Sequence, residues 1–145
     1  MRERWLLGLV LVSTACLACG GGRKGSSGFR LPDGDAERGR AVFVANRCHA
    51  CHTVAGEDLP APVAQPAVPV RLGGQVSAAI TDGDLVTSIV FPSHRLAARV
   101  EPAAVRSGGL SRMGDFTEAM KVRDLIDLVA YLQSRYTVVP PVYYK

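Results

Sequence analysis

The sequence predicts a small all-α domain, and three observations lead to this fold class. Two stretches, Asp35 to Arg47 and Val122 to Tyr136, place apolar residues at helical spacing. Between them, the segment Leu59 to Val70 contains four prolines, which exclude a helix or a central strand there. The chain has 145 residues, a length that suits one small domain. We therefore expect a few helices packed around a thin core.

The chain begins with a segment typical of an export signal. Residues 1–5 carry basic side chains, and Leu6 to Ala15 form an apolar run that is too short to span a membrane. Cys19 then stands before three glycines and resembles the lipid-bearing cysteine of bacterial lipoproteins. Cys16 is the alternative lipid site, and an ordinary secretory signal is the third interpretation. We expect residues 1–18 to be removed and the domain to be exported.

A tether and then the first helix follow the signal segment. Residues 19–33 are rich in glycine, serine and basic side chains, a composition typical of a flexible tether. Asp33 or Asp35 is the expected N-cap of the helix Asp35 to Arg47. Gly39 lies inside this helix, where glycine costs up to about 1 kcal/mol relative to alanine. We interpret Gly39 as a point where another helix approaches closely.

The chemistry of the chain centres on the motif Cys48-His49-Ala50-Cys51-His52. A Cys-x-x-Cys-His sequence is the attachment pattern of haem c. On one helical turn, the thiols of Cys48 and Cys51 can reach the two vinyl groups along one haem edge. The imidazole of His52 then lies under the porphyrin, where it can bind the iron. The sequence therefore predicts one covalent haem, and it gives His49 no metal role.

Two other kinds of site, a zinc site and a thiol redox site, use the same spacing of two cysteines. A zinc site needs a second pair of ligands, which the chain lacks, because Cys16 and Cys19 lie in the leader and His94 stands alone. A thioredoxin-like redox pair follows a strand, whereas the flanks here are helical. The missing second ligand pair and the helical flanks of the motif therefore both favour haem attachment. With two cysteines on haem and one on lipid, no disulfide remains to be formed.

The first and last helices carry a specific family resemblance. Gly34 to Phe43 resembles the N-terminal helix of class I c-type cytochromes, and Tyr131-Leu132 is similar to the aromatic–leucine pair of their C-terminal helix. The resemblance covers residues 34–136 and implies about four helices packed around one covalent haem. It also implies that Gly39 and Phe43 pack near this pair, where the two helices cross.

In the same family a backbone carbonyl accepts the Nδ1–H of the haem histidine, and a proline packs on its ring. That hydrogen bond fixes the tautomer and makes the ligand more basic. The resemblance implies that this proline lies about ten residues beyond His52, and Pro60 and Pro62 both fit that spacing. The proline-rich segment is expected to be an extended wall beside the haem.

Helix-capping residues and helix-breaking prolines predict the remaining elements. Thr81 and Asp84 form the pattern of a capping box, and Pro92 ends the helix that they start. In the last helix, Arg123 and Asp127 form an i,i+4 ion pair of small value. Residues 137–145 include two adjacent prolines and are expected to lie extended over the surface.

Three residues are candidates for the second iron ligand. Met113 lies in the loop Gly108 to Phe116, and Met-Gly-Asp-Phe there resembles the family's Met-Pro-x-Phe ligand loop. Met120 stands directly before the last helix, at a position suited to a hydrophobic staple. His94 follows the proline that ends the middle helix. We favour Met113.

The expected function is transfer of single electrons between membrane or periplasmic redox proteins. With two axial ligands the iron has no open position, and the sequence offers no nucleophile–base pair, so we expect no catalytic residues and no enzyme activity. We expect a redox donor and acceptor and a membrane contact through lipid, on the periplasmic face of a bacterial membrane. Nucleic acids and small-molecule substrates are not expected. The alternatives are a haem subunit of a larger oxidoreductase, such as a terminal oxidase or a sulfur-oxidising enzyme, and a haem-based gas sensor.

Overall fold

The computed structural model describes residues 29–60, 70–95 and 102–140. The helices in this part are α1 (Ala36–Ala45), α2 (Asp82–Val90), α3 (Pro102–Val105) and α4 (Val122–Ser134), with the 3-10 turn η1 (Cys48–Ala50). The strands are β1 (His52–Val54), β2 (Val70–Leu72), β3 (Gly74–Val76), β4 (Arg106–Ser107), β5 (Leu110–Ser111) and β6 (Tyr136–Val138). Three helices of nine to 13 residues thus dominate the described part, and α3 has four residues. No helix in these ranges is both long and apolar enough to cross a membrane.

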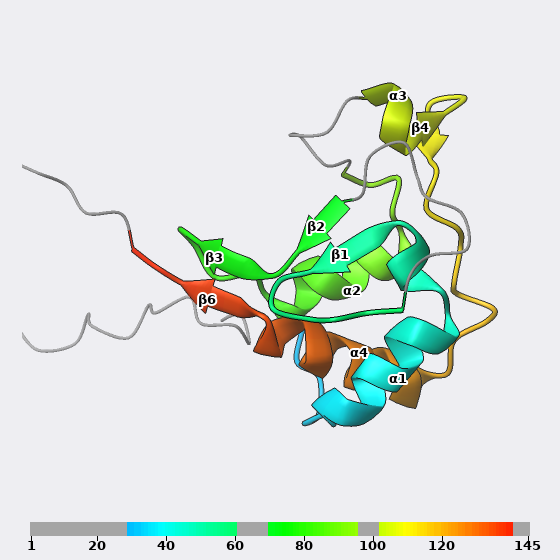
Figure 1. The fold of residues 1–145 in the computed structure, drawn as a ribbon. Helices are drawn as coiled ribbons and strands as arrows, with labels where there is room; N and C mark the ends of the chain where they lie inside the picture. Colours follow the sequence, from blue (N-terminus) through cyan, green and yellow to red (C-terminus); the bar gives the residue numbers. More distant parts are fainter. Residues whose placement is uncertain (1–28, 61–69, 96–101, 141–145) are drawn as a thin grey trace, which may run out of the picture.

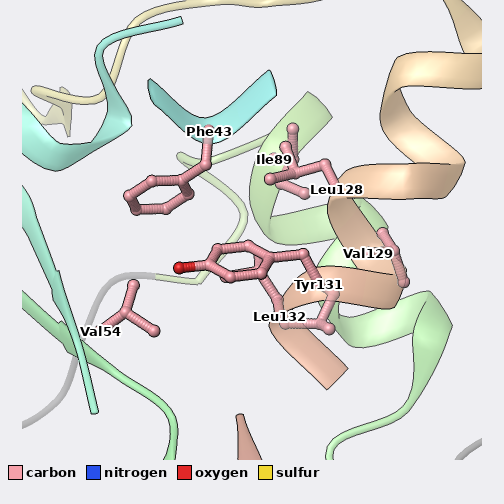
Figure 2. Close-up of a cluster of buried hydrophobic side chains, with 8 residues drawn as sticks. Phe43, Val54, Ile89, Leu128, Val129, Tyr131 and Leu132 are labelled. Carbon is pink, nitrogen blue, oxygen red and sulfur yellow. The ribbon is translucent and has the colours of Figure 1, made fainter. Parts of the chain in front are cut away.

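The crossing of α1 and α4 is the centre of the fold (Figure 1). At the crossing, a Cβ added to Gly39 would overlap the backbone oxygen of Asp127, so only glycine fits there. The rings of Phe43 and Tyr131 meet edge to face with centroids 5.7 Å apart (Figure 2). The close approach expected at Gly39, and its packing beside Tyr131, are therefore confirmed.

The hydrophobic core extends from this crossing to α2 and β1. Its buried apolar residues are Phe43, Val54, Leu85, Ile89, Leu128, Val129, Tyr131 and Leu132. Figure 2 shows side chains from all four of these elements converging on one cluster. Because β1 contributes one of them and also begins at His52, the core directly supports the segment that carries the haem motif.

The start of α1 is fixed by two aspartates. Asp35 is the N-cap, and its Oδ1 accepts a hydrogen bond from the backbone N–H of Arg38 at 3.0 Å. Asp127 of α4 is only 1% exposed, and its Oδ2 accepts from Nε of Arg38 at 2.9 Å. The expected i,i+4 attraction between Arg123 and Asp127 is present as a small contribution, and the main partner of Asp127 is Arg38 on α1. The closer contact with α1 decides where the carboxylate points, which helical spacing alone does not reveal.

The helix α2 begins with the expected capping box. The Thr81 side chain accepts from the Asp84 backbone N–H at 3.1 Å, and the Asp84 carboxylate accepts from the Thr81 N–H at 3.0 Å. The N-terminal end of α2 is also bound to α4. Nε2 of Gln133 on α4 donates to the Ile80 carbonyl at 2.9 Å and to Asp82 Oδ1 at 3.0 Å. These contacts hold α2 against the core.

Short strand pairs complete the described fold. The strands β1 and β2 pair in parallel with His52 opposite Val70, β3 pairs in parallel with β6, and β4 pairs antiparallel with β5. The hairpin β4–β5 turns through Gly108 and Gly109, which have φ values of 57° and 83°. The loop expected from Gly108 therefore contains β5. Ladders of two or three residue pairs are too short to give a period in the sequence, and for that reason they were not predicted.

Candidate functional site

The first cysteine of the motif, Cys48, starts the single turn η1, and the second, Cys51, is the C-cap that ends it. Arg47 connects α1 to this turn in the left-handed conformation with φ 57°, and the Cys51 N–H donates to the Cys48 carbonyl at 3.1 Å. Neither thiol is in a disulfide; Cys48 is half-buried against the core cluster and Cys51 is exposed. Burial raises the pKa of the Cys48 thiol to about 11. A raised pKa keeps the Cys48 thiol protonated, as is typical of a buried cysteine rather than a reactive thiolate.

The imidazole of His52 is held by the neighbouring strand. Its Nδ1 lies 3.2 Å from the carbonyl oxygen of Val70, directly across the β1–β2 ladder. A carbonyl only accepts hydrogen bonds, so Nδ1 carries the proton and Nε2 keeps a free lone pair. Burial lowers the pKa of His52, partly opposed by the Val70 carbonyl. The ring is therefore neutral near pH 7, as a metal-binding imidazole must be.

The carbonyl that the resemblance implies for His52 is that of Val70, and the choice between Pro60 and Pro62 for the proline on the ring stays a prediction. Pro60 is exposed, and Pro62 lies outside the described residues. The Val70 carbonyl is placed by strand pairing, because the Val70 N–H also donates to the Cys51 carbonyl at 2.9 Å. Sequence reasoning missed Val70 because three-residue strands leave no periodic signal. The only signal available was the change from prolines to Val70-Arg71-Leu72 at the end of the segment.

These residues fit a covalently attached haem c. The two thiols lie three residues apart at one turn, a neutral imidazole whose Nε2 carries a lone pair follows at once, and Cys48 lies against the apolar core cluster with other partly buried apolar side chains. Among the described residues, no three histidine, cysteine or acidic side chains gather in a way that could hold a metal ion. A structural zinc site uses four such ligands. Haem c therefore suits the donor set better than zinc.

The three candidates for the second iron ligand lie on different segments from the motif. Met113 is half-buried, two residues after β5, and its N–H donates to Ser111 Oγ at 3.1 Å. The β4–β5 hairpin lies at the end of the molecule away from the α1–α4 crossing (Figure 1). Met120 is half-buried against the core cluster and precedes Lys121, the N-cap of α4, which is the staple position expected for it.

His94 lies in the segment that follows α2. Its ring is exposed and packs beside Phe91 with centroids 5.7 Å apart. Both rings line a surface pocket of about 400 Å³ that also includes Phe29 and Arg95. The structure therefore brings Cys48, Cys51 and His52 together, and the choice of the second ligand stays a prediction. Cys19 and Cys16 lie outside the described residues.

Comparison with known proteins agrees with this geometry. Residues 36–135 match the family model described as cytochrome c. The chain is also similar to cytochrome c of Tetrahymena pyriformis, with 31% identity over 104 residues, covering 72% of this chain and 92% of that protein. The match spans α1, the cysteine–histidine motif and all of α4.

Proposed function

Because the chain belongs to the cytochrome c family, whose members share an all-α fold and a covalent haem c, we propose that it is a mono-haem carrier of single electrons. Family membership makes the protein a haem electron carrier with redox proteins as partners. The finer proposal is that its donor and acceptor are membrane or periplasmic redox proteins. It also includes a four-helix arrangement around one haem, with α3 as the fourth helix.

The observation that carries the proposal is the hydrogen bond between His52 Nδ1 and the Val70 carbonyl. We assign the thioether bonds to Cys48 and Cys51 and the axial iron positions to His52 and Met113. The bound haem supplies reversible one-electron chemistry at its iron. The Val70 carbonyl holds the proton on Nδ1, which orients the ring and raises the basicity of Nε2. No catalytic residue is proposed, because the chain's own groups bind and orient rather than transform a substrate.

Location and domain organisation form the second part of the proposal. The export signal and the cysteine before three glycines support a lipid-anchored protein on the periplasmic face of a bacterial membrane, with lipid on Cys19. The proposed organisation is a signal at residues 1–18, a tether at 19–33, the haem domain at 34–136 and an extended tail at 137–145. Removal of a leader that bears two arginines and one glutamate leaves a mild positive charge, so lipid rather than charge holds the protein at the membrane.

The test is covalent haem attachment. Extraction of the purified protein with acidified acetone should leave the colour with the polypeptide. The variants Cys48→Ser and Cys51→Ser should each lose one thioether bond, which the pyridine haemochrome spectrum reports. Release of all haem into the organic phase from the wild type would disprove the assignment. A reduced protein that readily binds carbon monoxide would instead favour the gas sensor.

A further inference from the structure

The carboxylate of Glu57 joins three separate elements. Its Oε2 pairs with Nε of Arg40 on α1 at 2.8 Å, and its Oε1 pairs with Nη1 of Arg135 at the C-cap of α4, also at 2.8 Å. The Glu57 side chain is only 11% exposed. The guanidinium of Arg135 in turn lies 5.2 Å above the ring of Tyr131, which is fully buried. This is a fixed pair with charge-assisted hydrogen bonds, unlike a typical exposed ion pair, which contributes little.

The pair between Glu57 and Arg135 lies beside the end of the strand ladder that begins at the haem motif. The Glu57 N–H donates to the carbonyl of Val54, the last residue of β1, at 3.2 Å. The Arg135 carbonyl accepts from the N–H of Gly74, at 2.8 Å, just after β2. A Cβ on Gly73 would lie 2.9 Å from both the carbonyl oxygen and the Cβ of Arg135, so this contact is tight. The ion pair therefore ties the loop after β1 to the start of β3, next to the end of the β1–β2 ladder, where the Ala55 N–H donates to the Leu72 carbonyl at 2.9 Å.

The hydrogen bond of His52 lies at the other end of the same ladder. The register runs from His52 opposite Val70 to Val54 opposite Leu72, which is only three residue pairs. A two-stranded ladder of this length is barely stable alone. A slip by one residue would move the Val70 carbonyl away from Nδ1, because neighbouring carbonyls along a strand point in opposite directions. Fixing the ladder's far end thus fixes the partner of the imidazole.

We propose that Glu57 and Arg135 are positioning residues for His52, which hold the Val70 carbonyl against Nδ1 and so tune the reduction potential of the haem iron. The proposal deepens the proposed function and rests on it, because it needs iron on Nε2. A firm Nδ1–H···O bond makes the imidazole a stronger electron donor and stabilises the oxidised iron. Loosening the ladder weakens that bond and raises the potential.

The experiment compares the haem-loaded wild type with Glu57→Gln, Arg135→Gln and Arg40→Gln. The midpoint potential and the exchange rate of the His52 Nδ1 proton, measured by NMR, are the two readouts. Glu57→Gln and Arg135→Gln should both raise the potential and speed the exchange. Arg135→Gln separates the proposal from a direct charge effect. Loss of a positive charge by itself stabilises the oxidised iron and lowers the potential, whereas a loosened ladder raises it. Arg40→Gln is the matched control: it removes one cation from the same carboxylate, leaves the Arg135 pair, and should leave proton exchange unchanged.

Two outcomes would overturn the proposal. A potential that rises in Glu57→Gln but falls in Arg135→Gln, with unchanged proton exchange, would show a direct charge effect only. Lower thermal stability with unchanged potential and exchange would show a purely structural role. If Arg135→Gln does not fold, the exchange rate of the His52 Nδ1 proton in Glu57→Gln tests the proposal alone. An unchanged rate there would contradict it. Wild type without covalent haem would instead mean that the proposed function has failed, which is seen before any variant is compared.

Discussion

The carboxylate of Asp127 on α4 accepts a hydrogen bond at 2.8 Å from the backbone N–H of Asp35, the N-cap of α1, 92 residues earlier in the chain. The same carboxylate receives Nε of Arg38 from the first turn of α1. A negative charge at a helix N-terminus is favourable, because the first N–H groups lack partners within the helix. One buried side chain thus binds the N-cap residue of α1 and fixes this helix on α4.

The first prediction concerns the acid stability that this contact gives. The hydrogen bond from Arg38, followed by that from the Asp35 N–H, holds the pKa of Asp127 below its ordinary value of 3.8. A carboxylate whose pKa is lower in the folded state adds stability above its unfolded pKa, and that stability is lost as pH falls through the folded pKa. Asp127→Asn should therefore lower the melting temperature at pH 7 and flatten its fall below about pH 4.

The control for Asp127→Asn is Glu118→Gln, which neutralises an exposed carboxylate. The measurement is the melting temperature of the wild type and both variants from pH 2 to 7. If Asp127→Asn follows the wild type across the whole pH range, the contact contributes no acid-labile stability.

The second prediction concerns the helix crossing. On helix propensity alone, Gly39→Ala should stabilise α1 by about 1 kcal/mol. The new Cβ would instead meet the backbone of Asp127, which cannot move aside as a flexible side chain can. We expect Gly39→Ala to lower the free energy of unfolding by roughly 1–3 kcal/mol, as overpacking does. Denaturant titration measures this, with Glu37→Ala on the exposed face of α1 as a control that should change it by less than about 0.5 kcal/mol. A more stable Gly39→Ala protein would mean that the crossing is looser than described.

The third prediction selects the second iron ligand. A methionine ligand gives the oxidised protein a weak sulfur-to-iron absorption band in the near-infrared. This band should vanish in Met113→Ala and persist in Met120→Ala and His94→Ala, because Met120 already packs on the core and His94 is exposed beside Phe91. Loss of the band only in Met120→Ala would identify the other methionine, and a wild type without the band would point to His94.

The fourth prediction concerns the lipid anchor. Cys19→Ser should abolish incorporation of labelled lipid and shift the protein from the membrane fraction to a soluble or unprocessed form, since the mild positive charge does not hold it there. Fractionation of cells expressing each variant measures this, with Cys16→Ser as the matched control. Loss of lipid labelling in Cys16→Ser alone would move the site to Cys16. Unlabelled wild type would indicate an ordinary secretory signal.

The sequence by itself determined the features that depend on neighbours in the chain. The spacing of Cys48, Cys51 and His52 predicts haem attachment, and family membership with its covalent haem c agrees with it. Local chemistry also placed the capping box at Thr81, since a cap involves residues only three positions apart. The interior glycine of α1 predicted a close helix approach, because glycine inside a helix requires a packing reason.

Only the tertiary structure decided which distant groups meet. Helical spacing gives Asp127 only the small pair with Arg123, but its carboxylate is buried on α1 with Arg38 as its main partner, because the crossing of the two helices sets where it points. The Val70 carbonyl became the partner of His52 through a three-residue ladder that has no periodic signature in the sequence. These contacts depend on the packing of segments many residues apart, whose relative positions are fixed only when the whole core forms.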